Sequence, residues 1–305
     1  MSRIDVMPSI KRNLGFTDLT KVSYKRAIGI ADLMTSVRNS YNVNLSPGLI
    51  LQWHKILMNS FKNINAGQWR KGDEAMQVGS SSYEREIIHF EAPPSSVVEK
   101  ERNHFVQWFN SDLLSSKDNI SKALLKSAIT HLYFESIHPF EDGNGRIGRA
   151  LAEYALSYSL ESPVLLSISR VIEKNKNKYY AALKNAQSTL DLTEWIAYFS
   201  QVILDAQIDA KHLVEFTVSK AKFFDRYKTH LNERELRVVN RMLEAGPGGF
   251  EGGMTARKYI AITKTSKATA TRDLRHLSEI GIFSIIGSGR SVRYELKLKD
   301  VGTAI

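Results

Sequence analysis

Twelve consecutive residues, 138–149, combine side chains that could accept a proton, hold a metal ion and bind phosphate. His138 can accept a proton near neutral pH without a large pKa shift. Asp142 is a hard oxygen ligand of the kind that holds Mg²⁺ together with substrate phosphates. Arg146 and Arg149 are three residues apart, so they share one face of a helix, and their guanidinium groups suit phosphate oxygens. The segment therefore predicts a site for a triphosphate and Mg²⁺ with a base beside it.

Two helices are expected to position these groups. Apolar residues recur at three- and four-residue spacing over residues 120–137 and again over 147–158, which predicts a helix–loop–helix. Pro139 ends the first helix, because the residue before a proline is pushed away from the α region. Residues 142–145 open the second helix, where free N–H groups and the helix dipole favour an anion and two glycines let it approach closely.

Structural interpretations of the same residues must also be considered. A Gly-Asn-Gly segment between helices is often only a turn, and a histidine before a proline is often structural. The combination of all these groups, in this order, favours the chemical interpretation. The chain has no GxxxxGK[ST] sequence, which disfavours ATP hydrolysis on a P-loop fold.

Residues 138–149 match the Fic-domain signature HPFx(D/E)GNGRxxR at every fixed position, so the chain resembles the Fic family. The resemblance implies a mainly α-helical fold that transfers AMP from ATP to a Ser, Thr or Tyr hydroxyl of a target protein, and of itself, with release of pyrophosphate. It implies His138 as the catalytic general base, Asp142 as the Mg²⁺ ligand and Phe140 as a core anchor. The implied ATP and phosphate contacts are Gly143, Asn144, Gly145, Arg146, Ile147, Gly148 and Arg149. Among them, Arg146 would contact the β-phosphate and Arg149 the γ-phosphate.

Two further stretches resemble parts of the same family. Residues 67–94 resemble its flap, a β-hairpin at about 76–92, in which apolar runs surround a Gly-Ser-Ser-Ser turn. An exposed hairpin edge can pair with a target strand and present its hydroxyl, here at Val78, Gly79 and Ser80; a plain surface hairpin is the alternative. Residues 178–183 resemble a stretch near the adenine, which implies nucleotide contacts at Tyr179, Tyr180 and Gln187. Aromatic residues at this spacing are also typical of a core.

The last quarter of the chain predicts a separate basic domain. Residues 225–305 contain 15 Lys and Arg against 9 Asp and Glu. Helices are expected at 231–245, 254–262 and 266–279, followed by strands at 282–286 and 291–296 around a Gly-rich turn. This order predicts a winged helix-turn-helix and resembles the C-terminal winged-helix domains of many bacterial Fic proteins. Possible DNA contacts are Lys267, Thr269, Thr271, Arg272, Arg290 and Arg293. Protein binding, or a basic face that is only solvated, is the alternative.

Composition places limits on the class of protein. The chain has 305 residues, 43% hydrophobic and 24% charged, with a net charge of +10, as expected for one or two globular domains. It has no apolar run near membrane-span length and no signal-peptide pattern, so we expect a cytoplasmic protein without a membrane partner. The absence of cysteine excludes disulfides and thiol-rich zinc sites. The expected domains are an N-terminal helical region (1–65), a Fic core (66–205), a linker helix (206–228) and a winged-helix domain (229–305).

One family feature is missing from the sequence. Many Fic proteins carry an inhibitory helix with the pattern (S/T)xxxE(G/N), whose Glu pairs with the second arginine of the signature, and this pattern is absent. Residues 6–15 resemble the stretch that follows that helix. We therefore expect that the sequence starts downstream of its inhibitory helix, that Arg149 is unpaired and that the site is constitutively competent.

The sequence leaves three other functions open. The same fold could transfer another group, such as phosphate or phosphocholine, although both arginines favour a nucleoside triphosphate. Removal of AMP would need the missing inhibitory Glu. The chain could also be a DNA-binding regulator whose Fic core senses nucleotide. The target protein, any DNA site and whether the chain forms a homodimer do not follow from the sequence.

Overall fold

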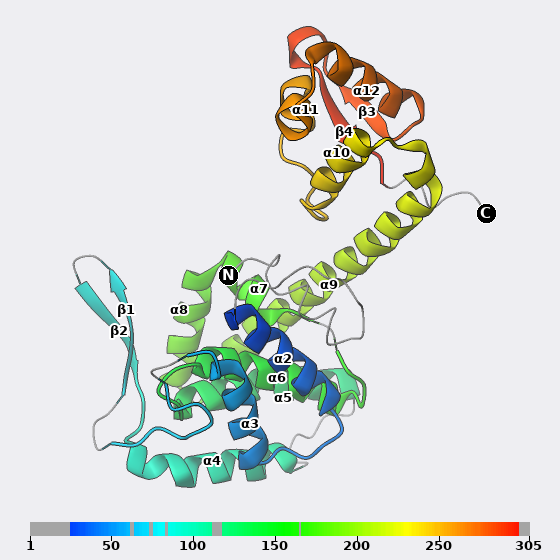
Figure 1. The fold of residues 1–305 in the computed structure, drawn as a ribbon. Helices are drawn as coiled ribbons and strands as arrows, with labels where there is room; N and C mark the ends of the chain where they lie inside the picture. The colour runs from blue at the N-terminus through cyan, green and yellow to red at the C-terminus, as the bar shows by residue number, and fades with distance from the viewer. Residues whose placement is uncertain are drawn as a thin grey trace. The chain divides into compact units, whose positions relative to one another are not determined.

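A computed structural model describes residues 25–61, 64–72, 76–82, 85–111, 118–164 and 166–298. Its α-helices are α2 (Lys25–Asn39), α3 (Pro47–Met58), α4 (Ser95–Asn110), α5 (Asn119–Ile137), α6 (Asn144–Ser159), α7 (Ile168–Lys174), α8 (Lys176–Gln187), α9 (Thr193–Tyr227), α10 (Glu233–Leu243), α11 (Ala256–Thr263) and α12 (Lys267–Glu279) (Figure 1). The strands β1 (Gln77–Ser82) and β2 (Arg85–Glu91) form one antiparallel hairpin, and β3 (Phe283–Ile286) and β4 (Arg293–Leu296) form another. Short 3₁₀ turns lie at Lys228–His230 and Gly289–Ser291. The fold is mainly α-helical, as the sequence predicts.

Helices α5 and α6 are the predicted helix–loop–helix. Asp118 caps α5 by accepting hydrogen bonds from the backbone amides of Ile120 and Ser121 at 3.3 and 2.9 Å. The helix ends at His138, whose backbone is left-handed with φ 49°. Gly143, also left-handed, is the N-cap of α6. Both predicted helices are therefore confirmed, and the signature residues 138–149 span the loop between them and the first turns of α6.

The chain divides into two compact units, Met1–Gln207 and Ile208–Ile305. Buried side chains of the first unit form two hydrophobic clusters. One cluster joins α3, α4, α5 and α6, and its large buried members are Trp53, Phe105, Phe109, Phe134, Phe140 and Tyr154. The other joins α5, α6, α7, α8 and the start of α9, and includes Trp195 and Phe199. Because α5 and α6 contribute to both clusters, the loop that joins them is anchored from two sides.

The β1–β2 hairpin differs from its prediction in the position of its turn. Residues 79–82, predicted as the turn, lie in β1 and pair with residues 85–88 of β2. The register shifts between Val78 and Gly79, where Val78 is opposite Phe90 and Gly79 is opposite Ile88. Gly and Ser residues, which are typical of turns, therefore continue the strand here.

The second unit contains three short helices and a hairpin around its own core. Phe223, Val238, Tyr259, Leu274 and Leu277 are fully or almost fully buried there. Met254, predicted as the start of a helix, instead forms an antiparallel bridge to Tyr294 in β4, and α11 begins at Ala256 after the Thr255 cap. The apolar side chain of Met254 suits a buried bridge as well as a helix, so the sequence pattern alone does not separate the two.

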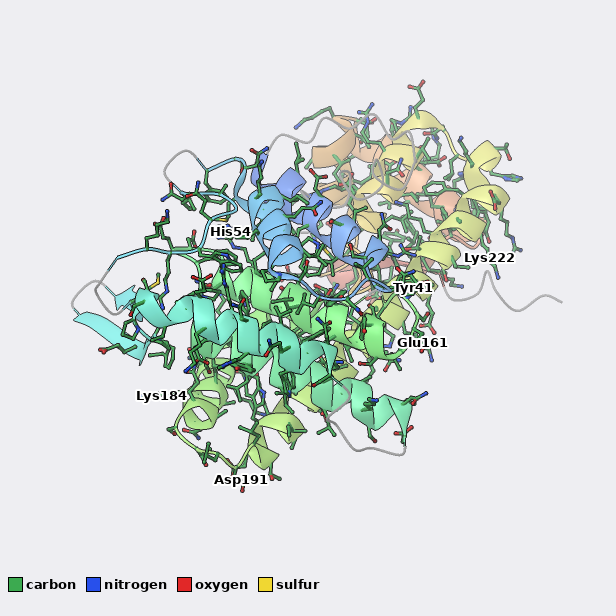
Figure 2. The ribbon with its side chains drawn as sticks, turned by 90° about the horizontal axis from the view of Figure 1, so that it is seen from below. Tyr41, His54, Glu161, Lys184, Asp191 and Lys222 are labelled. Carbon is green, nitrogen blue, oxygen red and sulfur yellow. The ribbon has the colours of Figure 1, made fainter. Side chains whose placement is uncertain are left out.

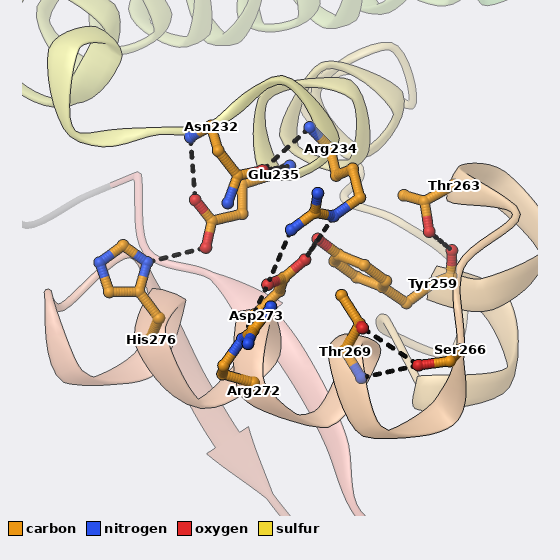
Figure 3. A network of polar contacts seen from close by, with 10 residues as sticks. All are labelled: Asn232, Arg234, Glu235, Tyr259, Thr263, Ser266, Thr269, Arg272, Asp273 and His276. Carbon is orange, nitrogen blue, oxygen red and sulfur yellow. Dashed lines mark hydrogen bonds and ion pairs between the residues drawn. The ribbon is translucent and has the colours of Figure 1, made fainter.

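Polar side chains connect the helices of this second unit (Figure 3). Asn232 caps α10 in a reciprocal capping box with Glu235. The other carboxylate oxygen of Glu235 lies 2.7 Å from Nδ1 of His276 on α12. Asp273 of α12 accepts hydrogen bonds from Arg234 at 3.0 Å and from the hydroxyl of Tyr259 at 2.8 Å. These contacts fix α10 and α11 against α12.

The long helix α9 is continuous over Thr193–Tyr227, contains nearly all of the linker helix predicted at 206–228, and includes the boundary between the two units. Within the residues that the structure describes, no helix is long and apolar enough to cross a membrane. The predicted segment 6–15 lies outside the described residues.

Candidate functional site

His138 is held at the point where α5 ends. Its backbone amide donates to the carbonyl of Phe134 at 3.0 Å, which closes the helix while the chain turns left-handed. The residue is only 9% exposed. Burial lowers the pKa of His138 to about 4; the nearby Arg70 charge lowers it too, whereas a hydrogen bond to the backbone carbonyl of Glu135 opposes the shift. His138 is therefore a neutral imidazole at physiological pH, which is the form that can accept a proton.

Asn144 fixes the shape of the loop from within. Its side chain accepts a hydrogen bond from the Phe140 amide at 2.9 Å and donates one to the Phe140 carbonyl at 2.7 Å. Because both ends of this side chain are used and it is 2% exposed, the side chain of Asn144 has a structural role here. Any phosphate contact from this residue must come from its backbone amide.

A histidine on α3 that was not predicted as a site residue supports the loop. His54, labelled in Figure 2, stacks on the Phe140 ring with centroids 3.8 Å apart. Its Nε2–H donates to the carbonyl of Asp142 at 3.0 Å, and its Nδ1 accepts from the amide of Gly67 at 2.9 Å. The Phe140 side chain is fully buried, so the prediction of a core anchor is confirmed. No local motif marks His54, and only its partners in the fold reveal its role.

Arg70 is a second residue without a sequence signal. Its Nε donates to the His138 carbonyl at 2.8 Å and its Nη1 to the Ser95 hydroxyl at 2.9 Å, and Nη2 donates to the Pro93 carbonyl. Its backbone amide also donates to the Pro139 carbonyl at 2.9 Å. Arg70 is 5% exposed and burial lowers its pKa. It joins the segment after the candidate base to the segment after the hairpin.

The first turn of α6 has the features of an anion site. The amides of Arg146 and Ile147 donate to the Gly143 carbonyl, and the Gly143 amide donates to the Asp142 carboxylate at 2.5 Å. Among the residues that the structure describes, the amides of Asn144 and Gly145 have no acceptor. Two unused donors at the positive end of a helix form a site that favours an anion.

Arg149 lies beside this turn. A Cβ placed on Gly145 would be 3.2 Å from its Nη1. Its Nε donates to the Ser169 hydroxyl at 2.8 Å, and no carboxylate of the described chain lies within ion-pair distance of its guanidinium. The two terminal nitrogens of Arg149 are thus available to a phosphate. Ile147 and Gly148, in contrast, face the protein interior and could contribute only through the backbone.

Asp142 and Arg146 form an exposed pair at the mouth of the loop. Their closest contact is 3.2 Å, and the Asp142 side chain is 52% exposed. No group of three or more His, Asp or Glu side chains that could hold a metal ion occurs in the described part of the chain. One accessible carboxylate fits Mg²⁺, which keeps several waters and is commonly held by one or two carboxylates plus substrate phosphates. The donor set is thus compatible with a metal that arrives with a nucleotide.

The three predicted adenine-side residues have different environments. Tyr179 is 3% exposed, and its hydroxyl lies 2.9 Å from Nε2 of His131, so it is a core residue in this structure. Tyr180 is 44% exposed, and Gln187 is half-buried with its amide nitrogen 3.4 Å from the Ser136 hydroxyl. Tyr180 and Gln187 are therefore better placed than Tyr179 to contact a ligand. Val78, Gly79 and Ser80 lie in β1, and their side chains lie outside what the structure describes.

The predicted DNA contacts of the second unit also differ in environment. Lys267 and Arg272 are exposed on α12. The Thr269 hydroxyl contacts the Ser266 cap at 3.0 Å, and the Thr271 hydroxyl donates to a backbone carbonyl of its own helix. Arg293 lies 3.6 Å from Glu295 on the same strand, and the side chain of Arg290 is outside the described residues. Of the predicted contacts, Lys267 and Arg272 are therefore the exposed basic side chains of α12, and Nε of Arg272 lies 4.0 Å from a carboxylate oxygen of Asp273.

Part of the chain is similar to known proteins. Residues 44–156 match the model of the Fic/DOC family. A probable protein adenylyltransferase of Aquifex aeolicus (strain VF5) is 36% identical over 98 residues, which cover 32% of this chain and 27% of that protein. The protein adenylyltransferase fic-1 of Caenorhabditis briggsae is 28% identical over 152 residues, which cover 50% of this chain and 26% of that protein. The chain thus matches about a quarter of the length of these relatives.

A Fic family crystal structure from Desulfovibrio desulfuricans G20 aligns with a TM-score of 0.48 at 20% identity, covering 97% of this chain and 86% of that one.

The matched segment contains α3, the hairpin, α4, α5 and nearly all of α6, and so includes all of the signature residues 138–149. Over these residues the chain is similar to the Fic/DOC family.

Proposed function

We propose that this protein is an adenylyltransferase that moves AMP from ATP to a hydroxyl of a protein. The observation that carries the proposal is the start of α6, where two unused backbone amides and the free terminal nitrogens of Arg149 lie on the loop that begins with the neutral His138. The named relatives are protein adenylyltransferases, which supports the same reaction. A triphosphate bound at the helix start would have its phosphates in the reach of both arginines.

The proposed reaction needs one base for the proton and releases one leaving group. The hydroxyl oxygen attacks the α-phosphorus while its proton passes to His138, and the bond from the α-phosphorus to pyrophosphate breaks with its electron pair on the leaving group. The amides of Asn144 and Gly145, with Arg146 and Arg149, stabilise the charge on the phosphates. The target would pair with the free edge of β1 at Val78–Ser80, which presents its hydroxyl to the base.

Asp142 would hold Mg²⁺ in this reaction. When bound, the ion would neutralise charge on the phosphates and orient the leaving group. Asp142 lies 3.2 Å from Arg146, and a nucleotide–metal complex would replace this contact with one to each partner.

Labelled ATP tests the proposal. Purified protein and a cell lysate are incubated with Mg²⁺ and ATP labelled at the α-phosphate, using the native chain, His138→Ala and, as a matched control, His104→Ala at an exposed position of α4. We expect label on a protein band with the native chain and the control, and none with His138→Ala. A second reaction with ATP labelled at the γ-phosphate distinguishes phosphate transfer. Label from the γ-position only, or none from either while calorimetry shows that ATP binds, would contradict the proposal.

We propose DNA binding by the second unit as a further candidate function. A capped helix that exposes Lys267 and Arg272, next to a β-hairpin in a unit with an excess of basic residues, supports it. Fluorescence anisotropy with duplex DNA at several salt concentrations tests it. Lys267→Ala with Arg272→Ala should weaken binding and reduce its salt dependence, whereas Arg241→Ala on α10 should not. Equal binding by all variants would argue against this face as a DNA site.

A further inference from the structure

Glu135 is a buried carboxylic acid that the reaction described above does not use. It lies one turn before His138 on α5, and its side chain is 7% exposed. Its Oε2 is 3.9 Å from Nδ1 of His138, which is within ion-pair distance but too long for a hydrogen bond. Its Oε1 is buried without a hydrogen-bond partner. A buried carboxyl group with one free oxygen is costly to retain unless it has a function.

The tight approach of α5 and α6 gives this carboxyl group its position. A Cβ on Gly148 would lie 2.3 Å from Oε1 of Glu135 and 3.1 Å from Nδ1 of His131, so only glycine leaves room for both groups. Nδ1 of His131 is also buried without a partner. The carboxyl group is therefore held against the backbone of α6 on one side and directed toward His138 on the other.

Charged and titratable groups from three helices surround this carboxyl group. His131 and His138 face it from α5, Arg149 from α6, and Tyr179 from α8. Burial raises the pKa of Glu135 to about 7, and the Arg149 charge opposes this shift. Around His138 itself, Arg70 and Asp142 contribute opposite effects on the pKa of the imidazole. Glu135 therefore changes charge close to physiological pH.

We propose that Glu135 is the positioning residue of His138, whose carboxylate holds the imidazole with Nδ1 toward it and stabilises the imidazolium that forms when Nε2 accepts the proton of the target hydroxyl. This inference rests on the proposed adenylyl transfer. The proton leaves the hydroxyl oxygen as the bond from that oxygen to the α-phosphorus forms. It resides on Nε2 while Nδ1–H faces the carboxylate of Glu135. No other reactant is needed.

The proposal has a kinetic consequence that depends on pH. Transfer requires Glu135 ionised and His138 neutral, so kcat should rise with pH through an apparent pKa near 7 and then level off. In Glu135→Gln, which keeps the shape of the side chain without its charge, kcat at pH 8 should fall by about 10- to 100-fold. The limb near pH 7 should disappear, and the KM for ATP should stay within about twofold, because the phosphate contacts are retained.

Glu153→Gln is the matched control. Burial also raises the pKa of Glu153 to about 7, and Glu153 also faces Arg149, but its carboxylate accepts a hydrogen bond from the amide of Ile168 and it has no contact with His138. The Glu153→Gln variant should keep the pH limb. If the limb is lost in Glu153→Gln and retained in Glu135→Gln, the inference is wrong.

An NMR titration, which does not depend on catalysis, tests this inference separately from the proposed function. With ¹³C-labelled histidine, the ring signal assigned to His138 by its loss in His138→Ala should shift through an apparent pKa near 7 in the native chain and not in Glu135→Gln. The same shift in both proteins would overturn the inference, whatever the activity. Absence of transfer by the native chain would reject the proposed function and leave this titration interpretable. A Glu135→Gln protein with native kcat and an unchanged pH profile would also overturn the inference.

Discussion

Arg70 connects three segments that are far apart in the chain. Its guanidinium donates to the buried carbonyl of His138 and to the partly buried carbonyl of Pro93 and hydroxyl of Ser95. None of these acceptors is charged, so the arginine acts through hydrogen bonds. Removing Arg70 leaves these acceptors without a donor. Each buried acceptor left unpaired lowers the free energy of unfolding by about 1–3 kcal/mol.

We expect Arg70→Ala to lower the free energy of unfolding by about 3 kcal/mol or more, and to reduce transfer, because the backbone of His138 loses a contact. Chemical denaturation followed by circular dichroism measures the first effect. The adjacent Lys71→Ala, at an exposed position, should change the free energy of unfolding by less than about 0.5 kcal/mol. Equal stability of the two variants would show that Arg70 does not connect these segments in solution.

The titration of Glu135 predicts how the free energy of unfolding depends on pH. The pKa of this carboxyl is about 7 in the folded protein and near its ordinary value of 4.5 when unfolded, so folding favours the protonated form. The stabilisation from the protonated group is fully present below about pH 4.5 and is lost as pH rises through about 7. His138 changes in the opposite direction, because its lowered pKa contributes stability above about pH 6.5 that is lost toward pH 4.

Glu135→Gln should therefore be more stable than the native chain at pH 8, by up to about 3 kcal/mol, and this advantage should vanish near pH 4.5. Denaturation at several pH values measures it. A variant that gains stability while losing kcat would distinguish a functional carboxylate from a structural one. Lower stability of Glu135→Gln at pH 8 would indicate that the carboxylate contributes mainly to folding.

At the residue scale, the sequence predicted the groups that lie together in the chain. Residues 138–149 could be identified because their chemistry is local and their spacing is fixed. His54 and Arg70 could not, because each reaches the loop from a distant segment without a motif of its own. Glu135 carries a weak signal, since an acidic residue three positions before a candidate base on a helix shares its face.

At the element scale, the start of α6 depends on Gly143. Its φ of 88° is left-handed, and a Cβ there would lie 3.3 Å from the Met58 sulfur and 3.5 Å from the His54 ring. A side chain at this position would strain the backbone and displace the residues that support the loop. The helix start and its supports are therefore coupled.

We expect Gly143→Ala to lower the free energy of unfolding by about 1–2 kcal/mol and to weaken ATP binding, because the free amides of α6 lose their orientation. Gly48→Ala in α3 is the control, since its Cβ meets nothing nearer than 3.9 Å and it lies in a helix, where alanine is preferred. Calorimetric titration with ATP measures the effect. Unchanged affinity in Gly143→Ala would indicate that the amides of this turn do not bind the nucleotide.

The elements themselves were mostly predictable, because periodicity and caps agree. α5, α6, α9 and α12 follow from apolar spacing and end near their predicted residues. The errors involve strands: the turn predicted at 79–82 is part of β1, and Met254 forms a bridge. Strand pairing depends on partners distant in sequence, so short polar or apolar segments do not reveal it.

At the scale of the whole molecule, two units have separate cores. The clusters around α5 and α6 contain no residue of the second unit, whose core is formed by α9 residues from Phe216 onward, α10, α11, α12 and the hairpin. The sequence predicts a core that ends at residue 205, and the two compact units meet between Gln207 and Ile208, within the continuous helix α9. No glycine or proline interrupts α9 at this boundary, because the same helix contributes to both cores.

Separate cores predict separate unfolding. Leu277→Ala, at a fully buried position of α12, should destabilise the second unit by about 2–5 kcal/mol. Differential scanning calorimetry of the full chain should show one transition lowered and the other unchanged, with ATP affinity retained. Leu190→Ala, at an exposed position, is the control. A single transition that moves as a whole would show that the two cores unfold together.

The left-handed backbone of His138 has a consequence for protein engineering. Glycine is the residue that most often occupies this position after a helix, and a non-glycine residue there costs about 1 kcal/mol or more. A library selected for heat resistance alone would therefore enrich His138→Gly and so discard the base that we propose. Folding and chemistry make opposite demands on this single position, and only a screen that measures both would retain the histidine.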